Sequence, residues 1–562
     1  MAICSIALAT PSHCANHVVH KRRTVEPIGW VQSHRAHADD TITLRIGMKQ
    51  QNLHMIENLL MDVAHPDPPT YGQHWTPKKV VDFFAPSEST VSSIRTWLSA
   101  SGIAEDKPRL SPNKGWIELD LTVATAERLL GTEYHIYEHP SGERQIGCLS
   151  YSVPEHISDH VGVIKPTVHL NYRLPEYPAR LRRRANLNHL GQPSITHVPR
   201  ALANGAKIDA TLSLTNCDQF VTLECLRALY DFCYIPGATE KNSYGIESPL
   251  TCPSVEFTPQ TYRSPDLDLF FKKFSSTQIG QRPTLVSIDG CKSPNSSVNS
   301  ESDLDLEYAM VLTNPQPVTL LQTGDIVEEP ESCGIIQPPY VVSVSYAQDE
   351  GTATHRYATR QCNGYGKLGL LGTTVLYGSG DDGVAGGGGV CQNSSGDNDV
   401  NAVRFNPAFP ASCSFVVSVG ATQINSGATV NDPESAYFFS GGGYSDIFPM
   451  PSYQATTVAK FLKEHPPPYN AAQFNNSGKA RGFPDLSANG LNYTIALDGR
   501  FKLVSGTSAS SPVVGKRPFA HAFNDITAGK NPGCGIVRGW DPVTGLGTPN
   551  FEKLLHLFLE LP

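Results

Sequence analysis

The sequence of 562 residues lacks the features that would place it in a membrane or on nucleic acid. No run of about 18 uninterrupted apolar residues occurs, and that length is the minimum for a membrane-spanning helix. No long stripe of Lys and Arg occurs either, and acidic residues outnumber basic ones by 53 to 44. The chain therefore offers no surface that would track a phosphate backbone. We expect a soluble monomer that binds neither nucleic acid nor a membrane.

Zinc motifs and a recognisable catalytic histidine are also missing. The 13 cysteines form no CxxC pair and no close Cys/His cluster, which argues against a structural zinc site. None of the 19 histidines lies in a His-Gly-Thr setting. Disulfides stay open, and the odd number of cysteines leaves at least one thiol unpaired in a monomer. Four N-x-S/T sequons lie in turn-like surroundings that suit a glycoprotein, at Asn295, Asn393, Asn475 and Asn492.

What the chain does contain is enough apolar surface for a large core. Hydrophobic residues make up 40% of the chain, and the 47 glycines and 43 prolines suit a loop-rich fold. Residues 1–15 are interpreted as an irregular signal peptide, because 2–9 resemble a short apolar h-region although no basic segment precedes them. A disordered start or a wrongly assigned first exon is the alternative.

Residues 16–171 are predicted to form a compact α+β module. Strand patterns alternate with helical ones, and Thr76-Pro77 is a helix start signal. The expected strands are 41–48, 116–121 and 134–139, and the expected helices are 52–63, 77–84, 87–101 and 125–131. Residues 172–200 are rich in Pro and Arg without periodicity, which indicates a linker. The arginine-rich run 180–184 is either a solvated part of that linker or a processing site.

Beyond residue 205 the pattern changes to buried β-branched runs separated by helices. The expected strands are 284–289, 318–324, 340–347, 373–380, 414–421 and 493–499. Such a pattern predicts an α/β fold with a largely parallel sheet covered by helices on both faces. Active sites in such sheets collect at the carboxyl ends of the strands.

Three short motifs carry candidate chemistry in this part of the chain. In Ser-Gly-Thr-Ser (505–508), a glycine turn presents Ser508 at a helix start, which suits a nucleophile, although most such segments are only turns. Glu301 and Asp305 lie four apart on one helix face, where two carboxyls share a proton, or else form an exposed acidic first turn. Asp381 follows a buried strand and either donates from a protonated carboxyl to an oxyanion or forms an Asx-turn.

Two carboxylates near the C-terminus offer hard oxygen ligands. Asp525 and Asp541 lie beside turn carbonyls and glycines, as calcium ligands do. Helix capping by these two residues is the other interpretation.

Together these motifs resemble the sedolisin family of serine-carboxyl peptidases. The resemblance rests on Glu-x-x-x-Asp at 301–305, Ser-Gly-Asp-x-Gly at 379–383, Ser-Gly-Gly-Gly-Tyr-Ser at 440–445, Ser-Gly-Thr-Ser-x-x-x-Pro at 505–512 and the segment 539–550. Within the family, segments 225–232, 266–275 and 301–310 resemble secreted fungal tripeptidyl-peptidases. Segments 84–90 and 97–103 resemble the activation prodomain of the family.

The resemblance implies a fold, a set of site residues and a life history. The fold would be subtilisin-like at 201–562, after a ferredoxin-like prodomain that is shed. Ser508 would be the nucleophile, Glu301 the general base and acid, Asp305 its orienting partner and Asp381 the oxyanion donor. One structural Ca²⁺ would be held by the side chains of Asp525 and Asp541 and the carbonyls of Ile526, Val537 and Gly539. The enzyme would be secreted to the extracellular space, act at acidic pH and release tripeptides from free N-termini of peptides. Cys391 with Cys413 is the disulfide to test first.

Several departures from the family pattern keep alternatives open. The run between Ser508 and Asp525 is short, and Gly515-Lys516-Arg517-Pro518 would end the helix of the nucleophile after about two turns. Segment 247–254 places two prolines where one strand is expected, 324–340 is short, Val537 replaces a glycine, and Asp382 replaces a serine. The alternatives are a catalytically inactive homologue, a faulty gene model of a homologue, and a His-dependent subtilase.

Overall fold

The computed structural model describes most of the chain. The described residues are 16–23, 30–139, 144–170, 214–232, 243–247, 262–288, 299–323, 338–387, 389–393, 398–399, 402–514, 523–531 and 540–559. The expected signal peptide 1–15, the linker 172–200 and most of the segment 247–254 lie outside these residues, as do Val537 and Gly539. Among the described helices, none is long and apolar enough to cross a membrane.

The N-terminal unit is built on a four-stranded antiparallel sheet. Its strands run in the order β4 (Arg109–Leu110), β5 (Trp116–Thr122), β3 (Thr41–Met48) and β9 (Val161–Lys165). Helices α3 (Glu88–Ala100) and α4 (Val123–Leu130) pack on it through a shared apolar cluster. Alternation puts Ile42, Leu44 and Ile46 of β3 into this core. Because the chain order is strand–helix–strand–strand–helix–strand, the predicted ferredoxin-like arrangement is confirmed.

Local signals explain the helix bounds of this unit, and further strands complete it. Helix α2 (Pro77–Phe84) begins after Thr76, whose hydroxyl accepts from the Lys79 backbone N–H, so this helix forms where Thr76-Pro77 predicts it. The predicted helix at 52–63 is a short 3₁₀ turn followed by α1 (Ile56–Ala64). The remaining elements are β1 (His17–Arg22), β2 (Val31–Arg35), β6 (His135–Glu138), β7 (Arg144–Gly147), β8 (Ser150–Pro154) and α5 (Glu155–Ser158).

The C-terminal unit contains the predicted parallel sheet. Its order is β11-β12-β10-β13-β15-β19-β20, with β23 also paired to β19, and only β20 is antiparallel. The bounds are β10 (Tyr244–Glu247), β11 (Thr284–Ile288), β12 (Val318–Thr323), β13 (Val341–Val344), β15 (Thr374–Gly378), β19 (Val417–Gln423), β20 (Ser435–Ala436) and β23 (Leu486–Asn489). The predicted fold class is therefore confirmed.

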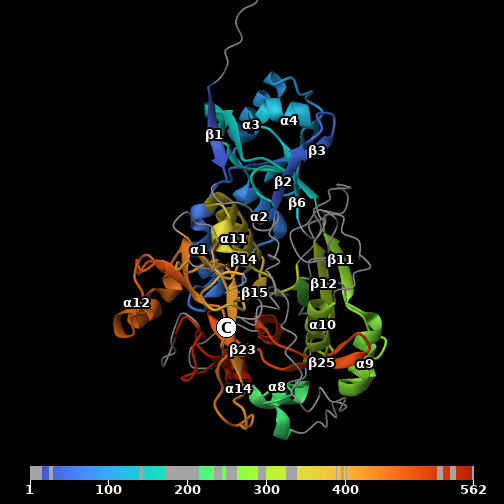
Figure 1. Ribbon diagram of the computed structural model, residues 1–562, viewed down its shortest axis with the longest axis vertical. Helices are drawn as coiled ribbons and strands as arrows, with labels where there is room; N and C mark the ends of the chain where they lie inside the picture. Colours follow the sequence, from blue (N-terminus) through green and yellow to red (C-terminus); the bar gives the residue numbers. More distant parts are fainter. Residues whose placement is uncertain are drawn as a thin grey trace, which may run out of the picture.

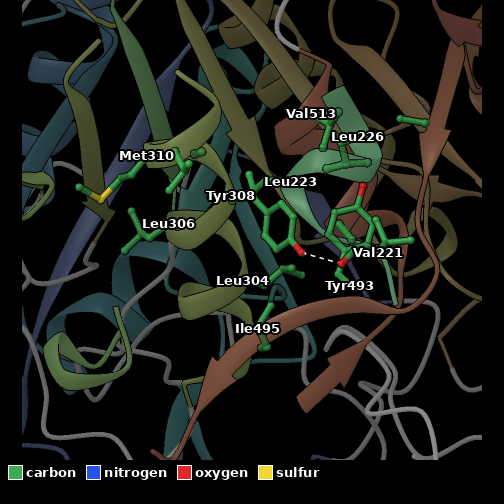
Figure 2. Close-up of a cluster of buried hydrophobic side chains, with 14 of the residues drawn as sticks. Val221, Leu223, Leu226, Leu304, Leu306, Tyr308, Met310, Tyr493, Ile495 and Val513 are labelled. Carbon is green, nitrogen blue, oxygen red and sulfur yellow. Dashed lines mark hydrogen bonds between the residues drawn. The ribbon is translucent and has the colours of Figure 1, made fainter. Parts of the chain in front are cut away.

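Helices cover both faces of this sheet. Within β15, Leu376 belongs to the apolar cluster of α8 (Leu223–Leu229), α9 (Ser264–Phe274) and α10 (Ser300–Leu312), whereas Val375 and Tyr377 belong to the cluster of α11 (His355–Leu370). In the first cluster, the Tyr308 hydroxyl of α10 donates to the Val221 carbonyl at 3.0 Å (Figure 2). It also lies 3.0 Å from the Thr494 carbonyl oxygen. All residues of α10 from Ser300 to Val311 are buried, so this helix runs through the interior.

One predicted strand lies elsewhere. Residues 493–499 were expected in the parallel sheet, but β24 (Tyr493–Leu497) pairs antiparallel with β25 (Arg500–Val504) as a separate hairpin. The two turn residues, Asp498 and Gly499, have φ of 55° and 74°. Positive φ at both positions is typical of a type I′ hairpin turn, and Asp-Gly is a preferred sequence for it.

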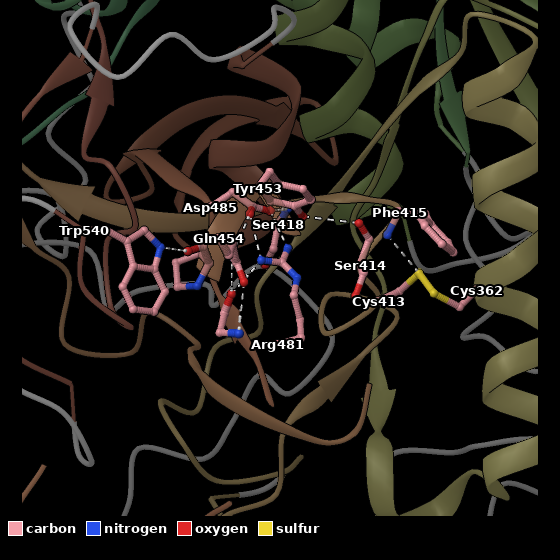
Figure 3. A network of polar contacts seen from close by, with 12 residues as sticks. Cys362, Cys413, Ser414, Phe415, Ser418, Tyr453, Gln454, Arg481, Asp485 and Trp540 are labelled. Atoms are coloured by element: carbon pink, nitrogen blue, oxygen red, sulfur yellow. Dashed lines mark hydrogen bonds and ion pairs between the residues drawn. A yellow bond between two sulfur atoms is a disulfide. The ribbon is translucent and has the colours of Figure 1, made fainter. Parts of the chain in front are cut away.

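The disulfides differ from the predicted pair. Cys413 bonds to Cys362 of α11 (Figure 3). Cys217 bonds to Cys225, and Cys391 is a free thiol. The expected Cys391–Cys413 pair is wrong because Cys391 lies in β16 (Cys391–Gln392), which pairs with β17 (Asn398–Asp399). Figure 3 also shows the fully buried Arg481, which donates to both carboxylate oxygens of Asp485, at 2.8 and 2.6 Å.

Helix α11 of the C-terminal unit contacts the N-terminal unit, which lies at the top of the molecule in Figure 1. The Arg360 guanidinium donates to the carbonyls of Met48 and Gly115, at 2.8 and 2.9 Å. Helix α1 packs on α11 through an apolar cluster that includes Ile56, Val63 and Leu370. The N-terminal unit is therefore docked on the C-terminal one by apolar, cation–π and hydrogen-bonded contacts.

Candidate active site

Ser508 lies in a buried turn between the hairpin and the central sheet. It belongs to the short helix α13 (Thr507–Ser510), which continues as a 3₁₀ turn to Val513. The helical part is thus about two turns long, as expected from the residues that follow. The preceding Gly506 packs against Asp381: a Cβ there would lie 2.8 Å from Asp381 Oδ2, so a larger residue would clash.

The two carboxyls of α10 lie within reach of this serine. Glu301 and Asp305 are both 1% exposed, so the alternative of an exposed acidic first turn is wrong. Burial raises the pKa of Glu301 well above its usual range, and the neighbouring charge of Asp305 raises it further. A hydrogen bond with the Ser508 hydroxyl acts in the opposite direction. Burial likewise raises the pKa of Asp305. Such a pair favours a single shared negative charge.

Ser345 connects the Glu301–Asp305 pair to the turn that carries Ser508. This residue follows β13 at its carboxyl end, and its hydroxyl donates to Asp305 Oδ1 and Oδ2 at 3.3 and 3.2 Å. The same hydroxyl lies 3.5 Å from the Ser508 carbonyl oxygen, and the Ser508 hydroxyl lies 3.4 Å from the Ser345 carbonyl oxygen. None of the motifs pointed to Ser345, although its place at the end of a parallel strand is a signal that could have found it.

Asp381 closes the other side of the site. It follows β15 by three residues, and its Oδ1 accepts from the Thr507 backbone N–H and hydroxyl at 2.6 and 2.9 Å. Its carboxyl thus binds the residue that precedes Ser508, which a local Asx-turn alone would not explain. Burial raises its pKa to about 6. Asp381, Ser345 and Ser508 line one pocket of about 60 Å³.

The four candidate catalytic residues are thus brought together, although they come from three separate segments. Among the described residues, the contacts of the Ser508 hydroxyl are with Ser345 and Glu301, and no histidine is among them. This arrangement can hold a proton on a buried carboxyl pair next to a hydroxyl, with a third carboxyl, that of Asp381, which is neutral below about pH 6.

Of the expected calcium ligands, the structure describes Asp525, Ile526 and Asp541. Asp525 is exposed and follows β26 (Phe523–Asn524), which pairs with β27 (Thr548–Pro549) beside the 541–547 loop. Asp541 is buried, and its carboxyl accepts from Val543 N, Thr544 N and the Thr544 hydroxyl at 2.9 to 3.0 Å, so it caps its own turn. In the described part of the chain, no group of three or more His, Cys, Asp or Glu residues could hold a metal ion.

Comparison with known proteins agrees with this arrangement. Residues 28–170 match the family model for the pro-kumamolisin activation domain. The chain is 35% identical to aorsin of Aspergillus oryzae, over 98% of this chain and 97% of that protein. It is 33% identical to the tripeptidyl-peptidase SED1 of Arthroderma otae, over 97% and 96%, and 33% identical to the tripeptidyl-peptidase sed1 of Aspergillus fumigatus, over 99% and 98%.

These relatives define the class to which the fold and site belong. The chain belongs to the sedolisin family of serine-carboxyl peptidases. Its N-terminal unit carries the activation domain of that family, so the resemblance inferred from the motifs is confirmed.

Proposed function

We propose that this chain is the precursor of a secreted acid serine-carboxyl peptidase that releases tripeptides from the free N-termini of peptides. The observation that supports this most directly is the buried Glu301–Asp305 pair, in which Glu301 hydrogen-bonds with the Ser508 hydroxyl and Asp305 accepts from the Ser345 hydroxyl. The tripeptide product is inferred from relatives named tripeptidyl-peptidases. Extracellular location, monomeric state and action at acidic pH are part of the same proposal.

We propose the roles that the family resemblance implies, and the positions of the four side chains support them. Ser508 Oγ attacks the scissile carbonyl carbon while its proton passes to Glu301, and Asp305 holds Glu301 in place. The tetrahedral oxyanion accepts a hydrogen bond from protonated Asp381. Glu301 then gives the proton to the leaving amine, and water hydrolyses the acyl-enzyme by the reverse sequence. Because burial raises the pKa of Asp381 to about 6, we expect the oxyanion donor to be lost above that pH.

We propose domain boundaries on the same basis. Residues 1–15 are the signal peptide, 16–171 the activation prodomain, 172–200 the processed linker and 201–562 the peptidase. The activation-domain match at 28–170 supports the second boundary. The prodomain is then an intramolecular partner that remains docked on α11 until it is removed.

Peptide digestion tests the proposed activity. The purified protein, matured at pH 4, should release successive three-residue fragments that mass spectrometry detects. Replacement Glu301→Gln should abolish release, whereas Glu307→Gln on the same buried helix should retain it, because the Glu307 carboxyl accepts from Ala496 N instead. An active Glu301→Gln variant would point to a His-dependent subtilase. A folded wild type without activity would make the chain an inactive homologue.

Calcium binding is a separate proposal. We propose that Asp525 and Asp541, with the carbonyls of Ile526, Val537 and Gly539, hold one structural Ca²⁺. The proximity of the Asp525 segment to the 541–547 loop supports it: a Cβ at Gly547 would lie 3.1 Å from Asp525 Cα. Chelation with EDTA should lower the melting temperature, and added Ca²⁺ should restore it. An identical melting temperature with and without EDTA would contradict the site.

A further inference from the structure

A second cavity lies between the activation domain and the peptidase, away from the catalytic residues. Its volume is about 390 Å³, within the range of small-molecule sites. The activation domain supplies one wall, from residues 50, 80, 81, 84, 113, 115, 116, 163 and 165. One face of α11 supplies the other wall, from residues 357, 360, 361, 364 and 367. On this face Gly364 meets open space, since a Cβ there would have no atom within 4 Å.

All charged side chains that line this interface cavity in the described part of the chain are positive. Lys165, Arg360 and Lys367 line it, and none of its described lining residues is Asp or Glu. Each cation packs over an aromatic face: Arg360 lies 4.2 Å from the Trp116 ring centroid, Lys165 4.9 Å from Tyr357, and Lys367 5.3 Å from Phe84. These contacts fix three positive groups around one space.

Burial and mutual repulsion disfavour the charged forms of Arg360 and Lys367. Burial lowers the pKa of Arg360 to about 10. Burial and the Arg360 charge lower the pKa of Lys367 to about 7. Arg360 uses two N–H groups on the carbonyls of Met48 and Gly115, and a guanidinium has five. An anion in the cavity would relieve this repulsion and accept the remaining donors. The amides of Gln50, Asn113 and Gln361 line the same space; Gln50 accepts from Lys367 Nζ, and Gln361 Nε2 donates to the Tyr365 hydroxyl at 3.1 Å.

We propose that this cavity binds a small polyvalent anion, a di- or tricarboxylate or a phosphate, that bridges the activation domain to α11. Carboxylate or phosphate oxygens would pair with the three cations, and an apolar body would lie against Val80, Phe84 and Val163. Because both domains contribute cations, the bound anion stabilises their docked state and slows shedding of the activation domain. Only this last consequence rests on the proposed function.

Calorimetry on the full-length precursor tests the site. A Ser508→Ala background keeps the chain intact, and citrate, inorganic phosphate and NaCl of matched ionic strength are titrated at pH 6. We expect one site for citrate or for phosphate, and the comparison tells which oxygen chemistry fits. Lys367→Gln should weaken binding about tenfold or more, because a charge-assisted contact is lost. Arg360 is the less suitable position, since its side chain also holds two backbone carbonyls.

Lys79→Gln is the matched control. This lysine also lies over an aromatic ring, 3.8 Å from the Trp75 centroid, but outside the cavity lining, so affinity should change less than twofold. Heats no larger than those of NaCl, or equal affinity in Lys367→Gln, would overturn the proposal. Citrate should also slow conversion of the unmodified precursor. If that precursor never matures, the proposed peptidase function fails while the measured anion site stands.

Discussion

The Ser345 hydroxyl donates to both carboxylate oxygens of Asp305, at 3.3 and 3.2 Å, and also lies 3.5 Å from the Ser508 carbonyl oxygen. This serine therefore holds the acid pair and the nucleophile turn in one hydrogen-bonded group. A donor to a carboxylate lowers its pKa, and Ser345 has this effect on both Glu301 and Asp305.

Ser345→Ala should shift the acidic limb of the pH–activity profile upward. Without the donor, the apparent pKa of the pair rises, so a higher pH is needed to free a carboxylate that accepts the Ser508 proton. The expected shift is about one pH unit, in line with the loss of a hydrogen bond to a charged group. The measurement is kcat/KM against pH. Ser343→Ala is the control, because Ser343 is also buried, lies two residues earlier and bonds to Ser511 at 2.9 Å; an equal shift there would contradict the role of Ser345.

Asp381 should determine the alkaline limb. Its pKa of about 6 means that the carboxyl is protonated below this pH and ionised above it, so activity should fall as pH rises through 6. Asp381→Ala should lower kcat about 10² to 10³-fold, as loss of an oxyanion donor does. Asp381→Asn keeps an N–H donor at all pH values, so it should retain more activity and lose the decline near pH 6. An alkaline limb that is unchanged in Asp381→Asn would assign that limb to another group.

Two histidines should make the docked precursor less stable in acid. His20 lies 3.3 Å from Arg356 with Lys21 nearby, and burial and these charges lower its pKa to about 4. His169 contacts Thr354 and the Tyr357 ring, and burial with the charges of Lys165, Lys21 and Arg23 lowers its pKa to about 3.

The direction of the effect follows from proton linkage. Both pKa values are lowered in the docked state, so the undocked state takes up protons first as pH falls below 6.5. Stability is lost from there down to about pH 4 for His20 and about pH 3 for His169. The melting temperature of the Ser508→Ala precursor should therefore decline with pH less steeply in His20→Gln and His169→Gln. Replacement of the exposed His156 by Gln should leave the slope unchanged. Parallel slopes in all variants would refute this prediction.

The Cys362–Cys413 disulfide should contribute more to stability than the Cys217–Cys225 disulfide. The first closes a separation of 51 residues and the second a separation of 8. The chain-entropy model gives about 4 kcal/mol for the longer loop and about 2.5 kcal/mol for the shorter one. Chemical denaturation of the double serine variants checks this order, and Cys391→Ser serves as the control because Cys391 is a free thiol. A larger loss from the shorter loop would contradict the entropic explanation.

Local patterns were sufficient for much of the fold. Strand β3 and helix α2 have the predicted bounds because alternation and a Thr-Pro start act within a few residues. Strand β24 was assigned to the wrong sheet because a buried apolar run fits a parallel strand and a hairpin equally well, and only the Asp498-Gly499 turn separates them. Likewise, the partner of Cys413 depends on how α11 packs, which sequence spacing does not contain.

The candidate site could be predicted as a set of residues but not as an arrangement. Glu301, Asp305, Asp381 and Ser508 lie in motifs that the sequence shows, whereas Ser345 has no motif and is found only where β13 ends beside α10. The protonation states of Glu301, Asp305 and Asp381 could not be predicted from the sequence either, because their raised pKa values come from burial by distant segments.

The brevity of α13 has a consequence for how the chain tolerates change. Thr507 is tied to Asp381, Ser510 to the carbonyls of Ala488 and Asn489, and Ser511 to Ser343. These three residues around Ser508 are thus anchored to three different strands or the loops that follow them, and none of these anchors lies downstream of residue 514. Changes of length confined to residues 515–522 should therefore leave the Ser508 hydroxyl in place, whereas trimming into the buried residues Phe523, Trp540 and Val543 would remove part of the core.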